Sequence, residues 1–202
     1  MTIIDYYFTP QSPWTYLGHE RLLAMAAKYK AQVRCKPCDM GKVFSVSGGL
    51  PLSKRPPQRL AYRLQELARW RDHLGLALNI NPKFFPVAGD DAARLIVAAR
   101  QRYGEAVALT LTGCILKAVW ADEQNIADRS QLSALAKLAG AGDLSEADCE
   151  NPAAQAEYDT NTQVGMDLQV FGAPWYLIEG ESFWGQDRLD FVERKLAKLS
   201  AQ

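Results

Sequence analysis

Residues 3–17, IIDYYFTPQSPWTYL, decide how this chain begins to fold. The β-branched and aromatic run Ile3–Phe8 predicts a buried strand, and the prolines after it mark a turn. A helix is expected next, because Ser12 suits an N-cap, Pro13 suits the first helical position, and apolar residues then recur at helical spacing. Val33–Pro37 is a second strand-like run. The start of the chain therefore predicts a β-α-β unit with parallel strands.

The end of the chain predicts two more strands and a helix. Trp175–Ile178 and Ser182–Trp184 are β-favouring runs separated by the short segment Glu179-Gly180-Glu181, which is a hairpin pattern. An amphipathic pattern from Gln186 to Leu199 predicts a closing helix. The two ends thus follow the order β-α-β and β-β-α, which is the order of a thioredoxin-like sheet.

Between the two ends, the sequence predicts helices and no strand. Helical patterns cover Leu60–Leu74, Asp90–Tyr103, Glu105–Ala121, Ser130–Leu138 and Pro152–Gly165. Residues 41–60 are rich in Gly, Ser and Pro and predict a long loop, of a kind that is usually functional or mobile. We therefore expect an α/β, thioredoxin-like fold with a large all-helical insertion between its βαβ and ββα halves. Residues 1–38 and 166–202 would form a discontinuous thioredoxin-like domain, and residues 39–165 the inserted helical subdomain.

The composition predicts a globular protein that binds a small ligand. The chain has 202 residues, of which 48% are hydrophobic and 23% are charged, enough to bury a sizeable core. Its 23 basic and 23 acidic residues cancel, so no net field attracts nucleic acid or an anionic membrane. No apolar run reaches the roughly 20 residues that span a bilayer, and the N-terminus lacks a basic segment followed by an apolar core. We therefore expect a cytoplasmic protein with neither a nucleic-acid nor a membrane partner.

Cys35 and Cys38 have the CxxC spacing of a redox pair or of half a zinc site. A zinc site needs two more ligands at matched spacing, and the two other cysteines and the two histidines stand apart. A redox pair needs a helix N-terminus to stabilise its thiolate, whereas Cys35 ends a strand-like run. We interpret both cysteines as buried packing residues, with no metal bound and no disulfide between them.

The tetrapeptide Ser12-Pro13-Trp14-Thr15 has the shape of a thioredoxin-type CPWC motif in which hydroxyls replace both sulfurs. Disulfide exchange is excluded there, because it requires thiolates. What remains is a helix N-terminus, which favours a bound anion. If that anion is a ligand's thiolate, Ser12 can donate it a hydrogen bond of about 1.5–3 kcal/mol, which lowers the thiol pKa by about one to two units. The alternative is that Ser12 is simply an N-cap.

Two further features suit a peptide-like thiol. Gly172-Ala173-Pro174-Trp175 begins the predicted hairpin with a proline, which a strand tolerates at its first position. In a thioredoxin-like fold the Ala173-Pro174 bond would be cis and would leave a backbone edge open beside the helix N-terminus. Asp187, at the start of the last helix, can receive the α-amino group of a γ-glutamyl ligand, or can serve only as an N-terminal helix charge.

Together these residues carry a resemblance over nearly the whole chain. The chain resembles the 2-hydroxychromene-2-carboxylate isomerases, relatives of kappa-class glutathione transferases in the DsbA-like superfamily. The matching pieces are Tyr7-Phe8, Ser12 to Leu17, Arg55-Pro56-Pro57, Tyr62, Asn81-Pro82, Phe85-Pro86, Lys117 to Ala121, Val170 to Pro174 and Phe183 to Leu189.

The resemblance implies a function and a set of site residues. Ser12 would activate glutathione, Ala173 and Pro174 would hold its cysteinyl backbone, and Gln186 with Asp187 would hold its γ-glutamyl end. The thiolate would add reversibly to a 2-hydroxychromene-2-carboxylate, and the ring would open to a benzylidenepyruvate. The partner is thus a small aromatic carboxylate, and related proteins are commonly dimers, which implies a homodimer.

The resemblance is incomplete in the loop after the second strand. Family members often carry asparagine where this chain has Lys54, and lysine where it has Arg59. Arg59 keeps the charge and remains a candidate to grip a ligand carboxylate, although arginine and lysine differ in reach and geometry. Asn81 is a candidate substrate contact or simply an Asn-Pro turn.

Three aromatic residues are candidates to line an apolar site for the substrate: Phe85, Trp120 and Trp184. Trp120, at helical spacing, is more typical of a core position.

Two other functions stay open. A kappa-like transferase or peroxidase would consume glutathione instead of recycling it. A noncatalytic thioredoxin-like binding domain would have kept the fold and lost its sulfurs. Measuring glutathione binding separates the last of these from the enzymes.

Overall fold

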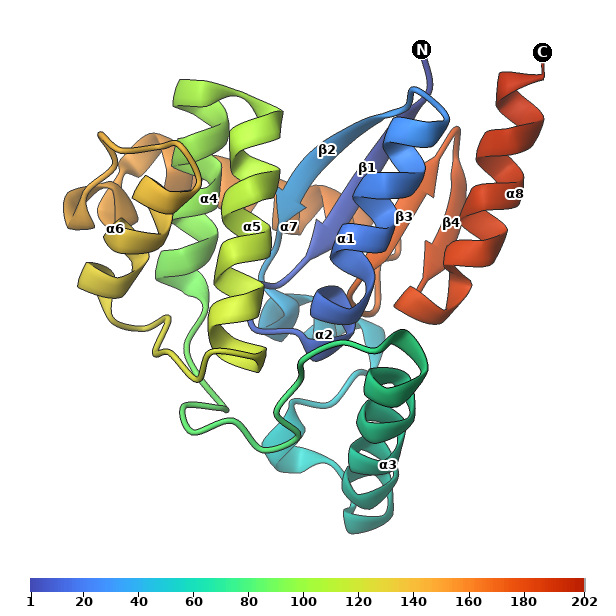
Figure 1. The fold of residues 1–202 in the computed structure, drawn as a ribbon, viewed down its shortest axis with the longest axis horizontal. Helices are drawn as coiled ribbons and strands as arrows, with labels where there is room; N and C mark the ends of the chain where they lie inside the picture. Colours follow the sequence, from blue (N-terminus) through green and yellow to red (C-terminus); the bar gives the residue numbers. More distant parts are fainter. Residues whose placement is uncertain (202) are drawn as a thin grey trace.

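The computed structural model describes residues 1–201 and centres on a four-stranded mixed sheet. Its strands are β1 (Ile3–Phe8), β2 (Gln32–Pro37), β3 (Trp175–Ile178) and β4 (Glu181–Trp184), in the order β2-β1-β3-β4. β1 pairs with β2 in parallel and with β3 antiparallel, and β3 and β4 form the expected hairpin. Both ends of the chain thus contribute to one sheet, as the thioredoxin-like order predicts (Figure 1).

Helices α1 (Pro13–Lys28) and α8 (Leu189–Ser200) pack against one face of this sheet (Figure 1). On β1, Ile4, Tyr6 and Phe8 belong to the large core that these helices help to bury, whereas Tyr7 belongs to a second cluster on the other face. This alternation follows from the period of two along a strand. The closing helix begins after the 3₁₀ turn Gln186–Arg188, three residues later than the sequence pattern predicts.

The segment between β2 and β3 is helical throughout its regular structure, which confirms the all-helical insertion. Its elements are α2 (Met40–Ser47), the 3₁₀ turn Leu52–Lys54, α3 (Pro57–Leu74), α4 (Asp90–Tyr103), α5 (Glu105–Trp120), α6 (Arg129–Leu138), the 3₁₀ turn Glu146–Glu150 and α7 (Pro152–Asp167). Helices α4 and α5 pack side by side next to β2, and α3 stands apart, beyond the end of the sheet where β1 and β2 terminate (Figure 1).

Helix α2 is a correction to the loop expected over residues 41–60. Asp39 caps it, because one carboxylate oxygen accepts from the N–H groups of Gly41 (2.8 Å) and Lys42 (3.2 Å). Gly48 ends it with a φ of 75°, which favours glycine. Val43, fully buried, anchors the helix to the second core cluster. Met40 is also buried in that cluster. The helix is short, so few apolar positions mark its period.

The cysteines of the CxxC segment lie on opposite faces of the sheet. Cys35 belongs to the large core and Cys38 to the second cluster, because residues three apart on an extended chain point opposite ways. Both thiols are free, as predicted. Burial raises the pKa of Cys38 to about 12 and also raises that of Cys35, so both stay protonated at neutral pH. Among residues 1–201, no helix has the length and apolar character needed to cross a membrane.

Candidate functional site

A cavity of about 490 Å³ lies where the N-terminus of α1 meets five other segments of the chain. Ser12 comes from the turn before α1, Ala173 from the approach to β3, and Trp184 from the end of β4. The α2 helix with the loop after it, the first turns of α3, and Phe85 complete the wall. A volume of this size suits a small-molecule ligand.

Ser12 lies at the N-cap of α1 and keeps a hydrogen to donate. Its Oγ accepts from the Thr15 N–H at 3.2 Å, so the N-cap interpretation is correct. The side chain is only 8% exposed and lines the cavity, and no other residue in the range 1–201 accepts its hydroxyl hydrogen. The N-cap role and an anion-stabilising role are therefore compatible, because one uses the oxygen's lone pair and the other its hydrogen.

The segment before β3 presents an unpaired backbone edge to the same cavity. The Ala173-Pro174 peptide bond is cis, as predicted. The Pro174 carbonyl oxygen accepts from the Gly185 N–H at 2.9 Å, whereas the N–H and carbonyl of Ala173 join none of the backbone hydrogen bonds described for residues 1–201. Ala173 lines the cavity and Pro174 is buried behind it. A peptide-like ligand can therefore pair with Ala173 without displacing an existing bond.

Two exposed aromatic rings form one rim of the cavity. Phe171 packs edge-on against Trp184, with ring centroids 4.8 Å apart, although the side chains are 43% and 51% exposed. A Cβ on Gly172 would lie 2.3 Å from Trp184 Nε1, so only glycine lets the indole pack here. Rings this exposed at a cavity mouth suit contact with an apolar ligand.

Three arginines line the opposite wall, and the sequence analysis singled out only one of them. Arg59, a predicted ligand, lies on the cavity together with Arg55 and Arg63. Burial and the charge of Arg55 lower the pKa of Arg63 to about 10, and burial with the charge of Arg59 lowers the pKa of Arg55. The available signal for Arg63 was its spacing from Arg59, because residues four apart on α3 share one face of the helix, whereas Arg55 precedes α3.

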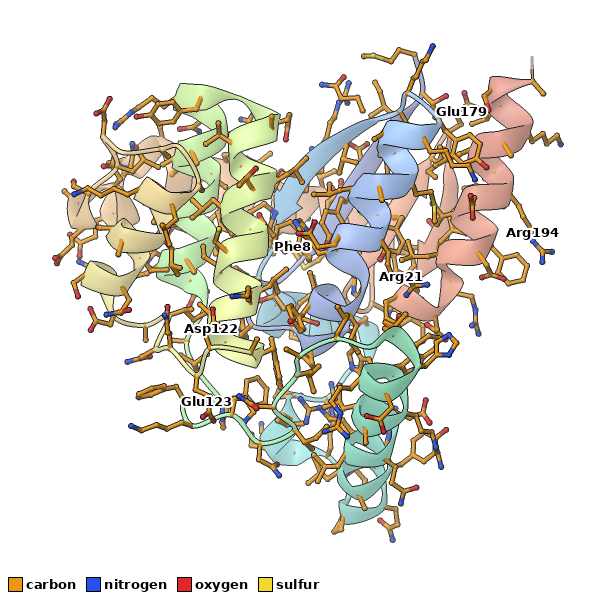
Figure 2. The ribbon with its side chains drawn as sticks, viewed as in Figure 1. Phe8, Arg21, Asp122, Glu123, Glu179 and Arg194 are labelled. Carbon is orange, nitrogen blue, oxygen red and sulfur yellow. The ribbon has the colours of Figure 1, made fainter. Side chains whose placement is uncertain are left out.

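Four predicted or considered residues lie away from this cavity. Gln186 is buried, and its side-chain oxygen accepts from Arg21 Nη1 at 2.6 Å. Figure 2 shows Arg21 on α1, on the side that faces α8. Asp187 is exposed and pairs with Arg188 (2.8 Å), and Asn81 and Lys54 are exposed. None of them lines the cavity.

Trp120 is a core residue, which is the alternative that its helical spacing favoured. Its side chain is fully buried in the large core and does not line the cavity. It packs against Phe85, with ring centroids 4.7 Å apart, and Phe85 is the residue that lines the cavity.

Comparisons with known proteins agree with this fold. Residues 3–197 match the family model of the DSBA-like thioredoxin domain. The chain is 30% identical to a 2-hydroxychromene-2-carboxylate isomerase of Pseudomonas putida, covering 99% of this chain and 97% of the relative. It is 23% identical to glutathione S-transferase kappa 1 of Caenorhabditis elegans over 94% of this chain and 88% of the relative. A solved structure of 2-hydroxychromene-2-carboxylate isomerase superposes with a TM-score of 0.78 at 25% identity, over 98% of this chain and 95% of that one.

Proposed function

The chain belongs to the DSBA-like thioredoxin family and, within it, to the 2-hydroxychromene-2-carboxylate isomerases, and we propose that it is a glutathione-dependent isomerase of 2-hydroxychromene-2-carboxylate. The observation that carries this proposal is the Ser12 hydroxyl. It is nearly buried, lines a cavity at a helix N-terminus, and has a hydrogen free to donate. A bound thiolate is the anion that this arrangement suits when the chain itself supplies no cysteine there.

The residues of the cavity fit glutathione. The unpaired backbone of Ala173 suits its cysteinyl amide and carbonyl, in the manner of an added strand. Arg59, exposed at the opposite wall, suits its glycyl carboxylate. Asp187 is assigned the γ-glutamyl amino group, which requires its carboxylate to leave Arg188. Gln186 is assigned a positioning role, since its amide holds Arg21 and is out of the ligand's reach.

The chain's own residues would then act as follows. When bound, glutathione supplies a thiolate that adds reversibly to the conjugated ring system and departs unchanged. Ser12 donates a hydrogen bond to the sulfur position and, with the positive end of α1, favours the ionised form. The aromatic rim formed by Phe171 and Trp184 and the ring of Phe85 exclude water and hold a planar substrate.

An absorbance assay with 2-hydroxychromene-2-carboxylate, with and without glutathione, tests the proposal. We expect conversion to the ring-opened product only when glutathione is present. The rate should saturate as the glutathione concentration is raised, and the total thiol should stay constant during the reaction. Conversion that is independent of glutathione would contradict the proposed role of Ser12. We also propose a cytoplasmic location, supported by four free cysteines, which are typical of a reducing compartment.

A second candidate is a kappa-like transferase, and the similarity to glutathione S-transferase kappa 1 favours it. The two candidates differ in the fate of the thiol. A transferase consumes one glutathione per turnover, whereas an isomerase returns it. Loss of titratable thiol in proportion to product, measured with the chromene and with a chloronitrobenzene acceptor, would favour the transferase.

A further inference from the structure

The three arginines that line the cavity, which we call the arginine wall (Arg55, Arg59 and Arg63), have no acidic partner. Within residues 1–201, the guanidinium groups of Arg59 and Arg63 make no hydrogen bond and no ion pair with the protein, and Arg55 donates only to the Leu50 carbonyl oxygen at 2.9 Å. No aspartate or glutamate lines the cavity. The cavity therefore carries an uncompensated positive charge on one side, and this charge suits an anionic ligand.

Arg63 is the member of the arginine wall whose unpaired state is hardest to explain by structure alone. One of its terminal nitrogens, Nη2, is buried and has no hydrogen-bond partner. Its guanidinium lies 5.2 Å from the ring centroid of Phe85 and 5.8 Å from that of Trp120. A ring face offsets part of the cost of removing this cation from water, but it satisfies none of the N–H donors. Because Arg63 lines the cavity and its guanidinium has no acceptor within residues 1–201, an acceptor on a ligand in the cavity is the partner that this group lacks.

The position of Arg63 also indicates which acceptor this is. It lies against Phe85, the aromatic residue of that wall, so a carboxylate bound to Arg63 would have its attached group beside the Phe85 ring. A planar aromatic acid fits both features, because guanidinium and carboxylate form a flat pair. The flexible glycyl carboxylate of glutathione lacks an aromatic group and is better matched by the exposed Arg59.

We propose that Arg63 binds the carboxylate of the aromatic substrate, with the aromatic ring against Phe85, and that this pair selects carboxylates attached to a fused aromatic ring system. This inference rests on the proposed function, since it divides one cavity between glutathione and substrate. Arg63 is then a specificity-determining residue. A neutral ring system of the same shape loses the pairing and leaves the guanidinium of Arg63 without an acceptor.

The test is a calorimetric titration with two matched probes, chromone-2-carboxylate and the uncharged chromone-2-carboxamide. Wild type should bind the acid at least about tenfold more tightly than the amide, as expected of a charge-assisted pair. Arg63→Gln should weaken binding of the acid by about tenfold or more and change the affinity for the amide by less than about twofold. Arg63→Lys keeps the charge but loses the planar, bidentate guanidinium. Its affinity for the acid should lie between those of wild type and Arg63→Gln. Equal affinity of wild type for the two probes, or unchanged binding of the acid to Arg63→Gln, would overturn the inference.

Arg69→Gln is the matched control, because Arg69 is on the same helix, pairs with Glu66 and does not line the cavity. It should bind both probes as wild type does. Glutathione is titrated separately into each variant, and Arg63→Gln should bind it within about twofold of wild type. If Arg63→Gln instead loses glutathione and keeps the acid, Arg63 belongs to the glutathione site, and only this inference fails. If wild type binds the acid and no glutathione, the proposed function fails while Arg63 keeps its assignment.

Discussion

Two groups of arginines in the helical insertion differ in their partners. In the block formed by α4, α6 and α7, Arg100 pairs with Glu157, Arg102 with Asp148 (2.9 Å), and Arg129 with Asp91 (2.6 Å). In the arginine wall, no guanidinium meets a carboxylate of the described residues. Both groups come from a chain whose net charge is zero.

This difference separates arginines whose ion pairs stabilise the fold from arginines that are available to bind a ligand. The paired arginines connect helices that are distant in the sequence, and their N–H donors are satisfied in the protein. The arginine wall does the reverse, because it brings three like charges to one cavity, where burial and these charges lower the pKa values of Arg55 and Arg63. The contacts of Arg63 with two aromatic rings offset only part of this cost. The binding role that we propose accounts for the unpaired charges. The four predictions that follow test this separation, from the largest expected effect to the smallest.

Replacing the Ser12 hydroxyl, in the same cavity as the arginine wall, should have the largest effect. Ser12→Ala removes the donor, and we expect turnover to fall by about 10- to 100-fold while the pKa of bound glutathione rises by about one to two units. Ultraviolet absorbance of the thiolate against pH measures that pKa. Ser47→Ala is the control, since Ser47 also lines the cavity but is not at a helix N-terminus. Coincident titrations of wild type and Ser12→Ala, with turnover lost, would contradict the proposed role.

A buried base between α1 and α5 should make stability depend on pH. Burial lowers the pKa of His19 to about 4, although its Nε2–H donates to the Leu109 carbonyl oxygen at 3.0 Å. The unfolded chain, with a pKa near 6.5, takes up the proton first as pH falls, so the stabilisation is complete above about pH 6.5 and is lost progressively toward pH 4. We expect a loss of about 2 kcal/mol between pH 7 and pH 5 in urea unfolding.

His19→Gln, whose amide can donate to the same carbonyl, should remove most of that pH dependence. An unchanged slope in this variant would assign the dependence to other groups. Probe binding to Arg63 should keep its preference for the acid in His19→Gln, since His19 does not line that cavity.

Breaking a paired arginine should reduce stability without affecting ligands. Arg100→Gln leaves Glu157 without its cationic partner on α4. Because both side chains are mostly buried, we expect a loss of about 1–2 kcal/mol in the free energy of unfolding, with glutathione affinity unchanged. Arg71→Gln, which breaks an exposed pair with Asp72, should leave stability unchanged. A large fall in ligand affinity for Arg100→Gln would show that the two groups are not separate.

Removing one charge from the arginine wall should have the smallest effect and the opposite sign. Arg59→Gln relieves repulsion with Arg55, whose pKa is lowered by burial and by the charge of Arg59, and should stabilise the ligand-free protein by about 0.2–0.5 kcal/mol. This corresponds to a rise of about 1 °C in the midpoint of thermal unfolding. The same variant should bind glutathione less tightly. A lower midpoint would mean that Arg59 holds the fold together.

Most of the fold could be predicted from the sequence because its signals are local. β1 was predicted with its observed bounds, and the start of α1 followed from Ser12 as a cap. The cis bond at Pro174 followed from the thioredoxin-like order of the strands. Helix α2 escaped detection because it is short and is stabilised by the caps Asp39 and Gly48 and by the burial of only two side chains, Met40 and Val43.

The site divides in the same way. The sequence by itself determined the chemistry at the N-terminus of α1, because a serine in place of a cysteine excludes disulfide exchange and leaves a hydrogen-bond donor. Only the tertiary structure decided that Arg63 faces Phe85 in the cavity, that Gln186 is used by Arg21, and that Trp120 is core. Helix caps and the hydrophobic periodicity of helices and strands depend on neighbours within a few residues, whereas a cavity wall depends on which distant segments pack together.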